Sequence, residues 1–327
     1  MWFNAVGCLM ALTLSLLAAP RTAHTQPSAT MPRIGYLALR ALAAEDAAFT
    51  QGLRELGWME GHNIAIEYRQ ADGQVERLPA LAAELVRLQV ACLVVRSTAV
   101  VQAAKDATAS IPIVVVLAAD LVETGLVASL ARPGGNITGM SGLGPELAGK
   151  HLEQLRALLP TLSRVAFLAY EGDPAHRLFL QEAQDAAERL SIQVQPVVIG
   201  RVEEIDRAFA AMRREQAEAL LVQPVFSSVL GQSQRIAALA VTHRLPAVSA
   251  QREFAAAGGL LAYGVDVLPM YRRAAVFVDK ILNGAKPGDL PVEQPMTFRL
   301  IINLKTAQAL GLTMPPSLLL LADEVIR

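Results

Sequence analysis

The clearest indication of the fold lies in Ile111–Gly139, IPIVVVLAADLVETGLVASLARPGGNITG. Its apolar β-branched run, Ile113–Leu117, predicts a strand buried on both faces, as in a parallel sheet. A helix-like pattern, Leu121–Leu130, then ends at a Pro-Gly-Gly-Asn break, and a short apolar strand follows. The first strand therefore delivers Asp120 to a strand carboxyl end, which is where open α/β sheets bind ligands.

Length and composition favour an α/β protein of two domains or one large unit. The 327 residues carry 29 basic and 30 acidic side chains, so the formal net charge is −1. Because no basic block or stripe occurs, nucleic acid is not an expected partner. Hydrophobic residues make up 53% of the chain and aromatic residues only 5%, which suits helices packed on a parallel sheet better than a β-sandwich.

The N-terminus has the features of a secretory signal over residues 1–30. Val6–Ala19 is apolar but short for a membrane span, and a stretch of small and polar residues follows it up to Pro32. No Lys or Arg precedes the apolar run, so an uncleaved anchor is the alternative. We expect cleavage within about residues 23–30 and a periplasmic or otherwise exported protein. Cys8 lies before the run, which argues against a lipoprotein, and Cys92 alone would remain, as a core residue.

An internal repeat indicates two similar lobes. Strands and helices alternate along the chain, which predicts parallel doubly wound sheets. Arg33–Leu39 aligns with Arg164–Tyr170, and Val75–Ser97 aligns without a gap with Val202–Pro224. The remainder, from Gly258 onward, is too short to fold alone. We therefore expect it to complete both lobes and to cross between them more than once, as in a hinged clamp.

The expected first lobe comprises 31–138 with about 265–292, and the expected second lobe comprises 139–264 with about 293–327. The run that follows the Pro-Gly-Gly break is predicted to make the first crossing between the lobes. A glycine that follows a later strand is predicted to lie at another crossing. The predicted hinge residues are Asn136, Ile137, Thr138, Gly139 and Gly264.

If the two sheets face each other, their strand carboxyl ends line a cleft. Ser97 and Thr98 open a helix, where hydroxyls and free N–H groups suit a carboxylate, or serve as ordinary N-caps. Asp120 is a candidate for binding an ammonium group, or else a cap for the next helix. The predicted ligand-binding residues are Ser97, Thr98, Ala119, Asp120, Tyr170, Glu171, Phe226, Gln251 and Tyr263.

The aromatic candidates among these, Tyr170, Phe226 and Tyr263, can stack on a flat ligand or belong to the core or rim. Glu171, like Arg252, offers a charged contact or lies on a solvated rim.

Catalytic signals are missing from the sequence. The five histidines have no metal-ligand spacing, and there is no Gly-x-Ser-x-Gly motif, P-loop or Gly-x-Gly-x-x-Gly motif. The Pro-Gly-Gly run follows a predicted helix rather than a strand, so it is not a phosphate cradle. We therefore expect no enzyme activity, no metal and no cofactor.

Four blocks of the sequence resemble the ABC-transporter substrate-binding protein family that includes the TrpX-like proteins. They are Ile111–Gly139, REFAAAGGLLAYG (Arg252–Gly264), YRRAAVFVDKILNGAKPGDLPVEQP (Tyr271–Pro295) and LIINLKTAQALGLTMPPSLLLLADEVI (Leu300–Ile326). The resemblance implies a type I periplasmic-binding-protein fold, with two Rossmann-like lobes, a three-strand hinge and ligand between the lobes. Some members of the family are associated with aromatic amino acids.

The sequence departs from the family pattern at two strand ends. Asp120-Leu121 stands where the family usually has Asp-Pro, and Tyr170-Glu171-Gly172-Asp173-Pro174 replaces an Asn-Pro-type turn.

The function we expect is capture of a small polar, aromatic or amino-acid-like solute for an ABC permease in the inner membrane, by a monomeric exported protein. The alternatives are a ligand sensor for a membrane receptor and an α/β cleft enzyme.

Overall fold

The computed structural model describes residues 31–142 and 147–327; the predicted signal segment and Cys8 lie outside them. A five-stranded parallel sheet of order β2-β1-β3-β4-β5 forms what we call the first lobe. Its strands are β1 (Arg33–Ala38), β2 (Ala65–Gln70), β3 (Leu93–Arg96), β4 (Ile113–Ala118) and β5 (Ile137–Ser141). Its helices are α1 (Ala43–Glu55), α2 (Leu78–Arg87), α3 (Thr98–Ala107) and α10 (Val267–Leu282).

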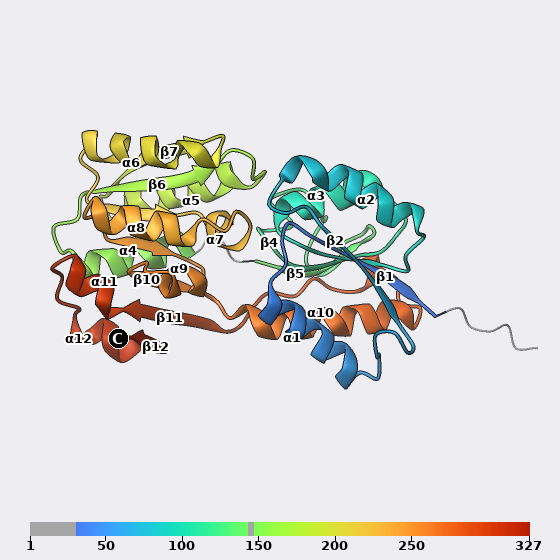
Figure 1. The fold of residues 1–327 in the computed structure, drawn as a ribbon. Coiled ribbons are helices and arrows are strands. Elements are labelled where there is room, and N and C mark those ends of the chain that lie inside the picture. Colours follow the sequence, from blue (N-terminus) through green and yellow to red (C-terminus); the bar gives the residue numbers. More distant parts are fainter. Residues whose placement is uncertain (1–30, 143–146) are drawn as a thin grey trace, which may run out of the picture. The chain divides into compact units, whose positions relative to one another are not determined.

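Strand β4 is buried on both faces, as its sequence predicts. Ile113 and Val115 belong to a core cluster with α2 and α3, whereas Val114 and Val116 join a separate cluster with α1 and α10. Side chains alternate along a strand, so an unbroken apolar run fills both layers of helices. Figure 1 shows α2 and α3 on one face of this sheet and α1 and α10 on the other.

The second lobe contains a seven-stranded sheet of order β12-β11-β10-β9-β8-β6-β7, in which only the β10–β11 pair is antiparallel. Its strands are β6 (Arg164–Tyr170), β7 (Gln193–Ile199), β8 (Ala219–Val222), β9 (Ala247–Ser249), β10 (Leu261–Val265), β11 (Phe298–Asn303) and β12 (Glu324–Ile326). Its helices are α4 (Leu147–Leu158), α5 (His176–Arg189), α6 (Ile205–Arg214), α7 (Val225–Ser228), α8 (Ser233–Thr242), α9 (Arg252–Ala256), α11 (Leu304–Ala309) and α12 (Pro316–Leu321). Short 3₁₀ turns occupy Val75–Arg77, Val202–Glu204 and Pro287–Asp289.

The internal repeat is present in the topology. The order β2-β1-β3-β4-β5 of the first sheet recurs in the second as β7-β6-β8-β9-β10, with the corresponding strands in the same sequence order. The two Rossmann-like lobes expected from the sequence are therefore confirmed. The C-terminal part of the chain contributes to both lobes, because α10 packs on the first sheet while β11 and β12 extend the second.

Two predicted local features differ from the structure. The pattern Leu121–Leu130 is not a helix. A single turn closes at Gly125, whose φ is +69°, with Leu126 N–H donating to Leu121 O at 2.9 Å; this is the bond that ends a helix.

The second difference concerns the first crossing, expected at Asn136–Gly139. Those residues lie in or next to β5, and the chain stays in the first sheet up to Ser141. Both ends of this segment are held close to β4 or the residues before it. A side chain at Gly139 would overlap the Val115 carbonyl oxygen, and Asn136 Nδ2 donates to Ile111 O at 2.8 Å. Further links between the lobes lead from β10 into α10 and from Leu290 to β11.

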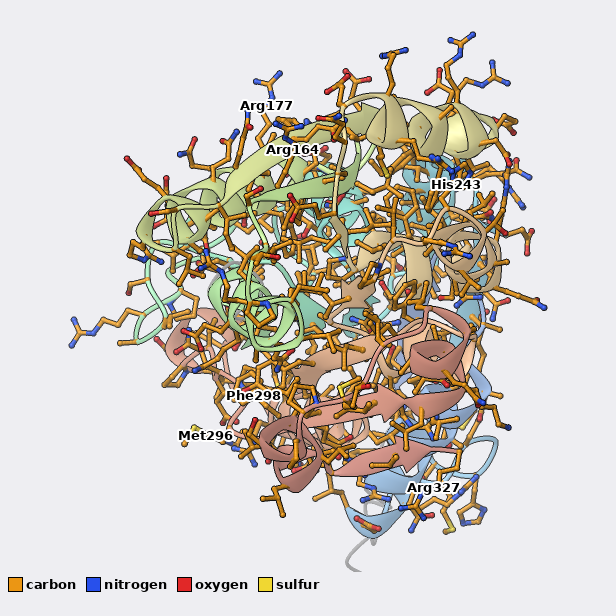
Figure 2. The ribbon with its side chains drawn as sticks, turned by 90° about the vertical axis from the view of Figure 1, so that its left-hand side faces the viewer. Arg164, Arg177, His243, Met296, Phe298 and Arg327 are labelled. Atoms are coloured by element: carbon orange, nitrogen blue, oxygen red, sulfur yellow. The ribbon has the colours of Figure 1, made fainter. Side chains whose placement is uncertain are left out.

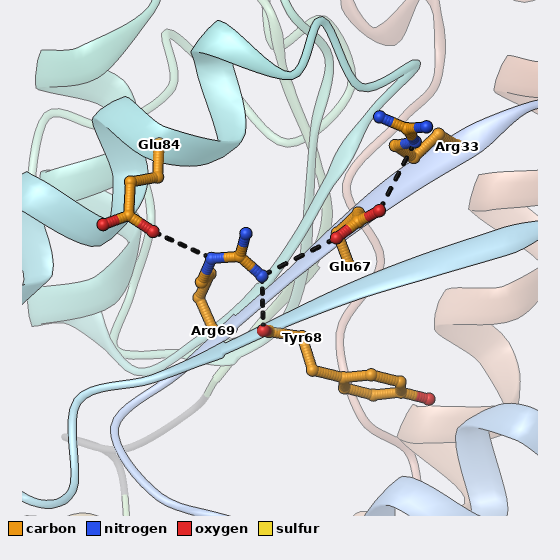
Figure 3. Close-up of polar contacts among 5 residues, drawn as sticks. All are labelled: Arg33, Glu67, Tyr68, Arg69 and Glu84. Carbon is orange, nitrogen blue, oxygen red and sulfur yellow. Dashed lines mark hydrogen bonds and ion pairs between the residues drawn. The ribbon is translucent and has the colours of Figure 1, made fainter.

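Charged side chains cover the exposed edge strand β2, which protects it from pairing with another chain. Arg69 Nε lies 2.9 Å from Glu84. Glu67 lies 3.4 Å from Arg33 and 3.7 Å from Nη1 of Arg69 (Figure 3).

On the second lobe, Met296 is 92% exposed and projects from the segment that leads into β11 (Figure 2). Within the described ranges, no helix has the length and apolar character needed to cross a membrane.

Candidate ligand-binding site

A cavity of about 90 Å³ lies between the two lobes, at the carboxyl ends of the strands. In the first lobe, the tips of β3 and β4 and the residue after β5 line it. In the second lobe, it is lined by the turn after β6, by α5 and by the tips of β8, β9 and β10. Its lining residues are Arg96, Ser97, Thr98, Leu117, Ala118, Ala119, Gly142, Leu147, Asp173, Phe179, Pro224, Val225, Ser228, Val229, Ala250, Gln251 and Val265. Strand carboxyl ends are where α/β sheets hold ligands.

The first-lobe wall is built around a strained residue. Ser97 has φ +73° and ψ 149°, a backbone conformation that residues other than glycine rarely adopt. Holding a residue in such a conformation costs about 1–3 kcal/mol. The strain is maintained because Ser97 N–H donates to Leu117 O at 2.8 Å, while Ser97 O accepts the N–H of Val101 in α3 at 3.0 Å. Backbone strain of this kind concentrates at ligand-binding positions.

The hydroxyls of Ser97 and Thr98 have different roles. Thr98 Oγ1 accepts the backbone N–H of Ala119 at 3.2 Å, which ties the tip of β3 to the tip of β4. Ser97 Oγ is buried and has no hydrogen-bond partner among the described residues, and it does not cap α3. A buried hydroxyl without a partner is costly, so Ser97 offers the cavity an unused donor and acceptor.

Arg96 also faces the cavity, although it was not among the residues predicted from the sequence. Its guanidinium lies over the ring of Tyr271, 5.9 Å from the ring centre. No ion pair of residues 31–142 and 147–327 includes Arg96. The last position of a short buried strand was the available signal, because an arginine there must reach either solvent or a binding site.

The second-lobe wall carries a buried carboxylate, Asp173, which exposes only 9% of its surface. Its Oδ1 accepts the backbone N–H of Ala175 at 3.1 Å, and its Oδ2 accepts from Gln223 Nε2 at 2.8 Å. Gln223 is fully buried, and its Oε1 accepts the N–H of Tyr170 at 2.8 Å. Both ends of the Gln223 amide are thus occupied, which fixes Asp173 in place.

Burial raises the pKa of Asp173 to about 6, although the Ala175 N–H and nearby His176 act in the opposite direction. The charged form is penalised because little solvent reaches it. A cationic group placed in the cavity would remove that penalty by favouring the carboxylate. This wall is therefore suited to binding an ammonium group.

The remaining lining is mainly apolar and comes from both lobes. Leu117 and Leu147 contribute to it, as do Val225, Val229 and the half-buried ring of Phe179 in α5. Small sites of this kind combine apolar walls with a few placed polar groups. The arrangement can hold a small molecule with an apolar part, a cationic group near Asp173 and an anionic group near Ser97.

Several residues proposed from the sequence lie at this cavity and others lie elsewhere. Ser97, Thr98, Ala119 and Gln251 line it. Asp120 does not: its Oδ1 accepts the N–H groups of Val122 and Glu123 at 2.8 and 3.0 Å, so it caps the turn that follows β4.

The aromatic candidates are also outside the lining. Phe226 is fully buried and packs edge-on against Tyr170 with ring centres 6.4 Å apart. Tyr263 stacks on Phe298 at 6.1 Å. Glu171 is exposed, and Arg252 pairs with Glu324 at 2.6 Å. Gly264 lies in β10, where any side chain would overlap the Ala250 carbonyl oxygen.

The described residues contain no group of three or more His, Cys, Asp or Glu side chains that could hold a metal ion.

The Asp173 side chain was missed because the turn after β6 presents two acids, and only the fold shows which of them turns inward. A polar Gln223 at the end of the apolar run Ala219–Val222 was the signal for its partner.

Comparison with known proteins identifies similar chains. The family described as ABC transporter substrate binding protein matches residues 37–326. A tyrosine-binding protein of Clostridioides difficile (strain R20291) is 25% identical over 264 residues, which cover 81% of this chain and 75% of the relative.

Two solved structures are similar over 90% of this chain and 99% of their own chains. An ABC domain from Streptococcus pneumonia in complex with L-Trp is 25% identical, with a TM-score of 0.84. The ligand-free, open structure of a substrate binding protein with adhesive properties from Clostridium difficile is 23% identical, with a TM-score of 0.65.

Proposed function

Since the chain belongs to the ABC transporter substrate binding protein family, we propose that it captures an amino-acid-like solute between its lobes and delivers it to an inner-membrane ABC permease. The observation that carries the proposal is the cavity at the strand carboxyl ends, where Asp173 of one lobe and Ser97 of the other contribute polar groups. The protein acts after export to the periplasm, with residues 1–30 as its cleaved signal, as a monomer and without catalysis.

The ammonium group of the solute binds to Asp173. The carboxylate is already oriented by Gln223 and by the Ala175 N–H, so binding requires no rearrangement of this wall. The carboxylate of the solute lies against Ser97 Oγ, and its side chain packs against Phe179 and Val229. A tyrosine-binding relative and an L-Trp-bound structure support a ligand of this class.

Closure of the lobes completes the site. Arg40, just after β1 of the first lobe, donates through Nη2 to Ser227 O of α7 in the second lobe at 2.8 Å. One apolar cluster runs from Leu37 and Val95 in the first lobe to Phe226 and Val229 in the second. These contacts favour the closed state, and a ligand that bridges both walls would stabilise it further.

The proposal is tested by thermal-shift measurements and isothermal titration calorimetry of the purified protein with the twenty amino acids, nucleosides and small carboxylates. A ligand that binds only the folded protein raises its melting temperature. We expect one or more amino acids to raise it by several degrees. Nucleosides should leave it unchanged, and stabilisation by no amino acid would contradict the proposal.

A further inference from the structure

Arg96 is a partly buried cation without a counterion. It ends β3, and its guanidinium lies 5.9 Å from the centre of the Tyr271 ring. The guanidinium makes neither a hydrogen bond nor an ion pair with residues 31–142 and 147–327. A cation placed over an aromatic face is stabilised only in part. Removing a charge from solvent without a hydrogen-bonded partner is unfavourable, so such a group is expected to serve a ligand.

The groups around Arg96 do not neutralise it. The phenols of Tyr36 and Tyr271 are 3% and 1% exposed, and burial raises the pKa of both, so they are uncharged. The carboxylate of Asp46 accepts from the Tyr36 hydroxyl at 2.7 Å and from Leu42 N–H at 3.2 Å. Burial opposes the charge of Arg96, but attraction from Tyr271 and, after it, from Glu45 and Glu253 outweighs burial and raises the pKa of the guanidinium; neither carboxylate forms an ion pair with it.

Arg96 also occupies a particular place in the site. Together with Ser97, Ser228 and Val229, it lines both the cavity described above and a smaller adjoining cavity that reaches Tyr36 and Arg40. Ser97, the next residue, holds its buried hydroxyl without a partner in the same two cavities. Two unused donor groups, one of them charged, therefore converge where the cavities meet.

We infer that Arg96 is the specificity-determining residue for an anionic group, and that it binds the carboxylate of the ligand at the junction of the two cavities. The inference rests on the proposed function and narrows its ligand to molecules that carry a carboxylate. A guanidinium matches the planar, two-oxygen geometry of that group. With Asp173 on the opposite wall, the site selects zwitterions, because each charge of the ligand meets its complement on a different lobe.

The experiment measures dissociation constants by calorimetry for wild type and Arg96→Gln. The probes are L-tyrosine, L-tryptophan and the other amino acids, their carboxamides, and the corresponding acids that lack the amine. For wild type we expect the carboxamides to bind at least about 30-fold more weakly than the amino acids. In Arg96→Gln that preference should fall to less than about threefold, because the amino acid alone loses its partner.

Three controls separate this role from a structural one. Arg96→Lys keeps the charge but loses the planar pair of donors, so it should retain only part of the preference for the acid over the amide, between the values for wild type and Arg96→Gln. Arg54→Gln removes an exposed cation at the end of α1 and should leave both affinities unchanged. Melting temperatures without ligand report whether each variant folds; if Arg96→Gln fails to fold, the acid-to-amide ratio of Arg96→Lys and wild type decides.

The outcomes distinguish the inference from the proposed function. If deaminated acids bind as well as amino acids and lose affinity in Arg96→Gln, the inference stands and the amino-acid ligand is wrong. If amino acids bind and their carboxamides bind equally well to wild type, the proposed function stands and the inference is overturned. Binding of no carboxylate at all would overturn both.

Discussion

The two walls of the cavity come from lobes with the same strand order but differ in charge and in how completely their polar groups are bonded. On the second lobe, Asp173 is anionic and held by Gln223 and Ala175 N–H. On the first lobe, Arg96 is cationic and Ser97 Oγ has no partner within the described residues. One wall is thus preorganised, whereas the other keeps open bonding capacity that a ligand can satisfy.

This contrast shows what the repeated topology does and does not determine. Equivalent strand tips, β3 with β8 and β4 with β9, place residues at the cavity in both lobes. Their side chains then decide the chemistry of each wall. A ligand that carries opposite charges at its two ends would draw the walls together, since each wall alone binds only one end.

The largest effect is expected from removing the anionic wall. Asp173→Asn should weaken binding of the amino-acid ligand by at least about 30-fold, because a buried charge pair loses one member. Isothermal titration calorimetry provides the measurement. Asp120→Asn is the matched control: its amide oxygen can still cap the turn after β4, and affinity should stay within about twofold of wild type. An equal loss in both variants would refute the assignment of Asp173.

The amide introduced by Asp173→Asn could present its own N–H group to Gln223 Nε2, which is also a donor, so the unliganded stability must be measured as well. A variant that folds with a lowered melting temperature and still binds as wild type does would also exclude Asp173 from the site.

A pH titration should sharpen the same contrast. Burial raises the Asp173 pKa from 3.8 to about 6, so the folded state takes up the proton more readily than the unfolded state. The protonated form of Asp173 therefore stabilises the folded protein below about pH 4, and this stabilisation is lost as pH rises through about 6. Across the whole transition, from well below pH 4 to well above pH 6, wild type should lose about 3 kcal/mol of unfolding free energy relative to Asp173→Asn. Urea unfolding at several pH values measures the difference, and parallel curves for the two proteins would contradict the shift.

The bonding of the second-lobe wall is tested by Gln223→Leu. The change leaves the N–H of Tyr170 and one oxygen of Asp173 buried without a partner, and it should cost about 2 kcal/mol of unfolding free energy. Gln195→Leu is the control, because Gln195 in β7 is similarly buried but its Oε1 has no hydrogen bond to lose. Chemical denaturation should rank the two clearly; equal costs would mean that the network does not stabilise this wall.

The smallest effect concerns the strained residue of the first-lobe wall. Ser97→Gly relieves a φ of +73° and should raise the unfolding free energy by about 1 kcal/mol, while ligand affinity falls severalfold with the loss of the hydroxyl. Ser97→Ala removes the same hydroxyl and keeps the strain, so it should lower affinity without the gain in stability. If glycine destabilises the protein, the strain is not stored at this position.

The fold followed from the sequence because its signals are repeated and local. The apolar run Ile113–Leu117 fills two layers of helices, and the match of Val75–Ser97 with Val202–Pro224 corresponds to equivalent elements of the two lobes. The pattern Leu121–Leu130 misled because its apolar spacing resembles a helix, whereas Gly125 in the left-handed conformation ends the first turn. Periodicity does not report where a glycine terminates a helix.

The residues that line the cavity followed from the sequence only in part. Strand ends can be counted from sequence, and Ser97, Thr98, Ala119 and Gln251 line the cavity. Which of two nearby acids points inward depends on the turn after β6, and this is why Glu171 was selected in place of Asp173. Arg96 was missed because its character comes from long-range packing against Tyr271 of α10, far away in the chain.

The central claim is that two oppositely charged walls close on one ligand molecule. Its most direct test is a crystal structure of the protein with the amino acid that binds best. We expect closed lobes, with the ammonium nitrogen within hydrogen-bonding distance of Asp173 and the carboxylate against Arg96 and Ser97. A ligand in the reversed orientation, or one bound away from both Asp173 and Arg96, would contradict it.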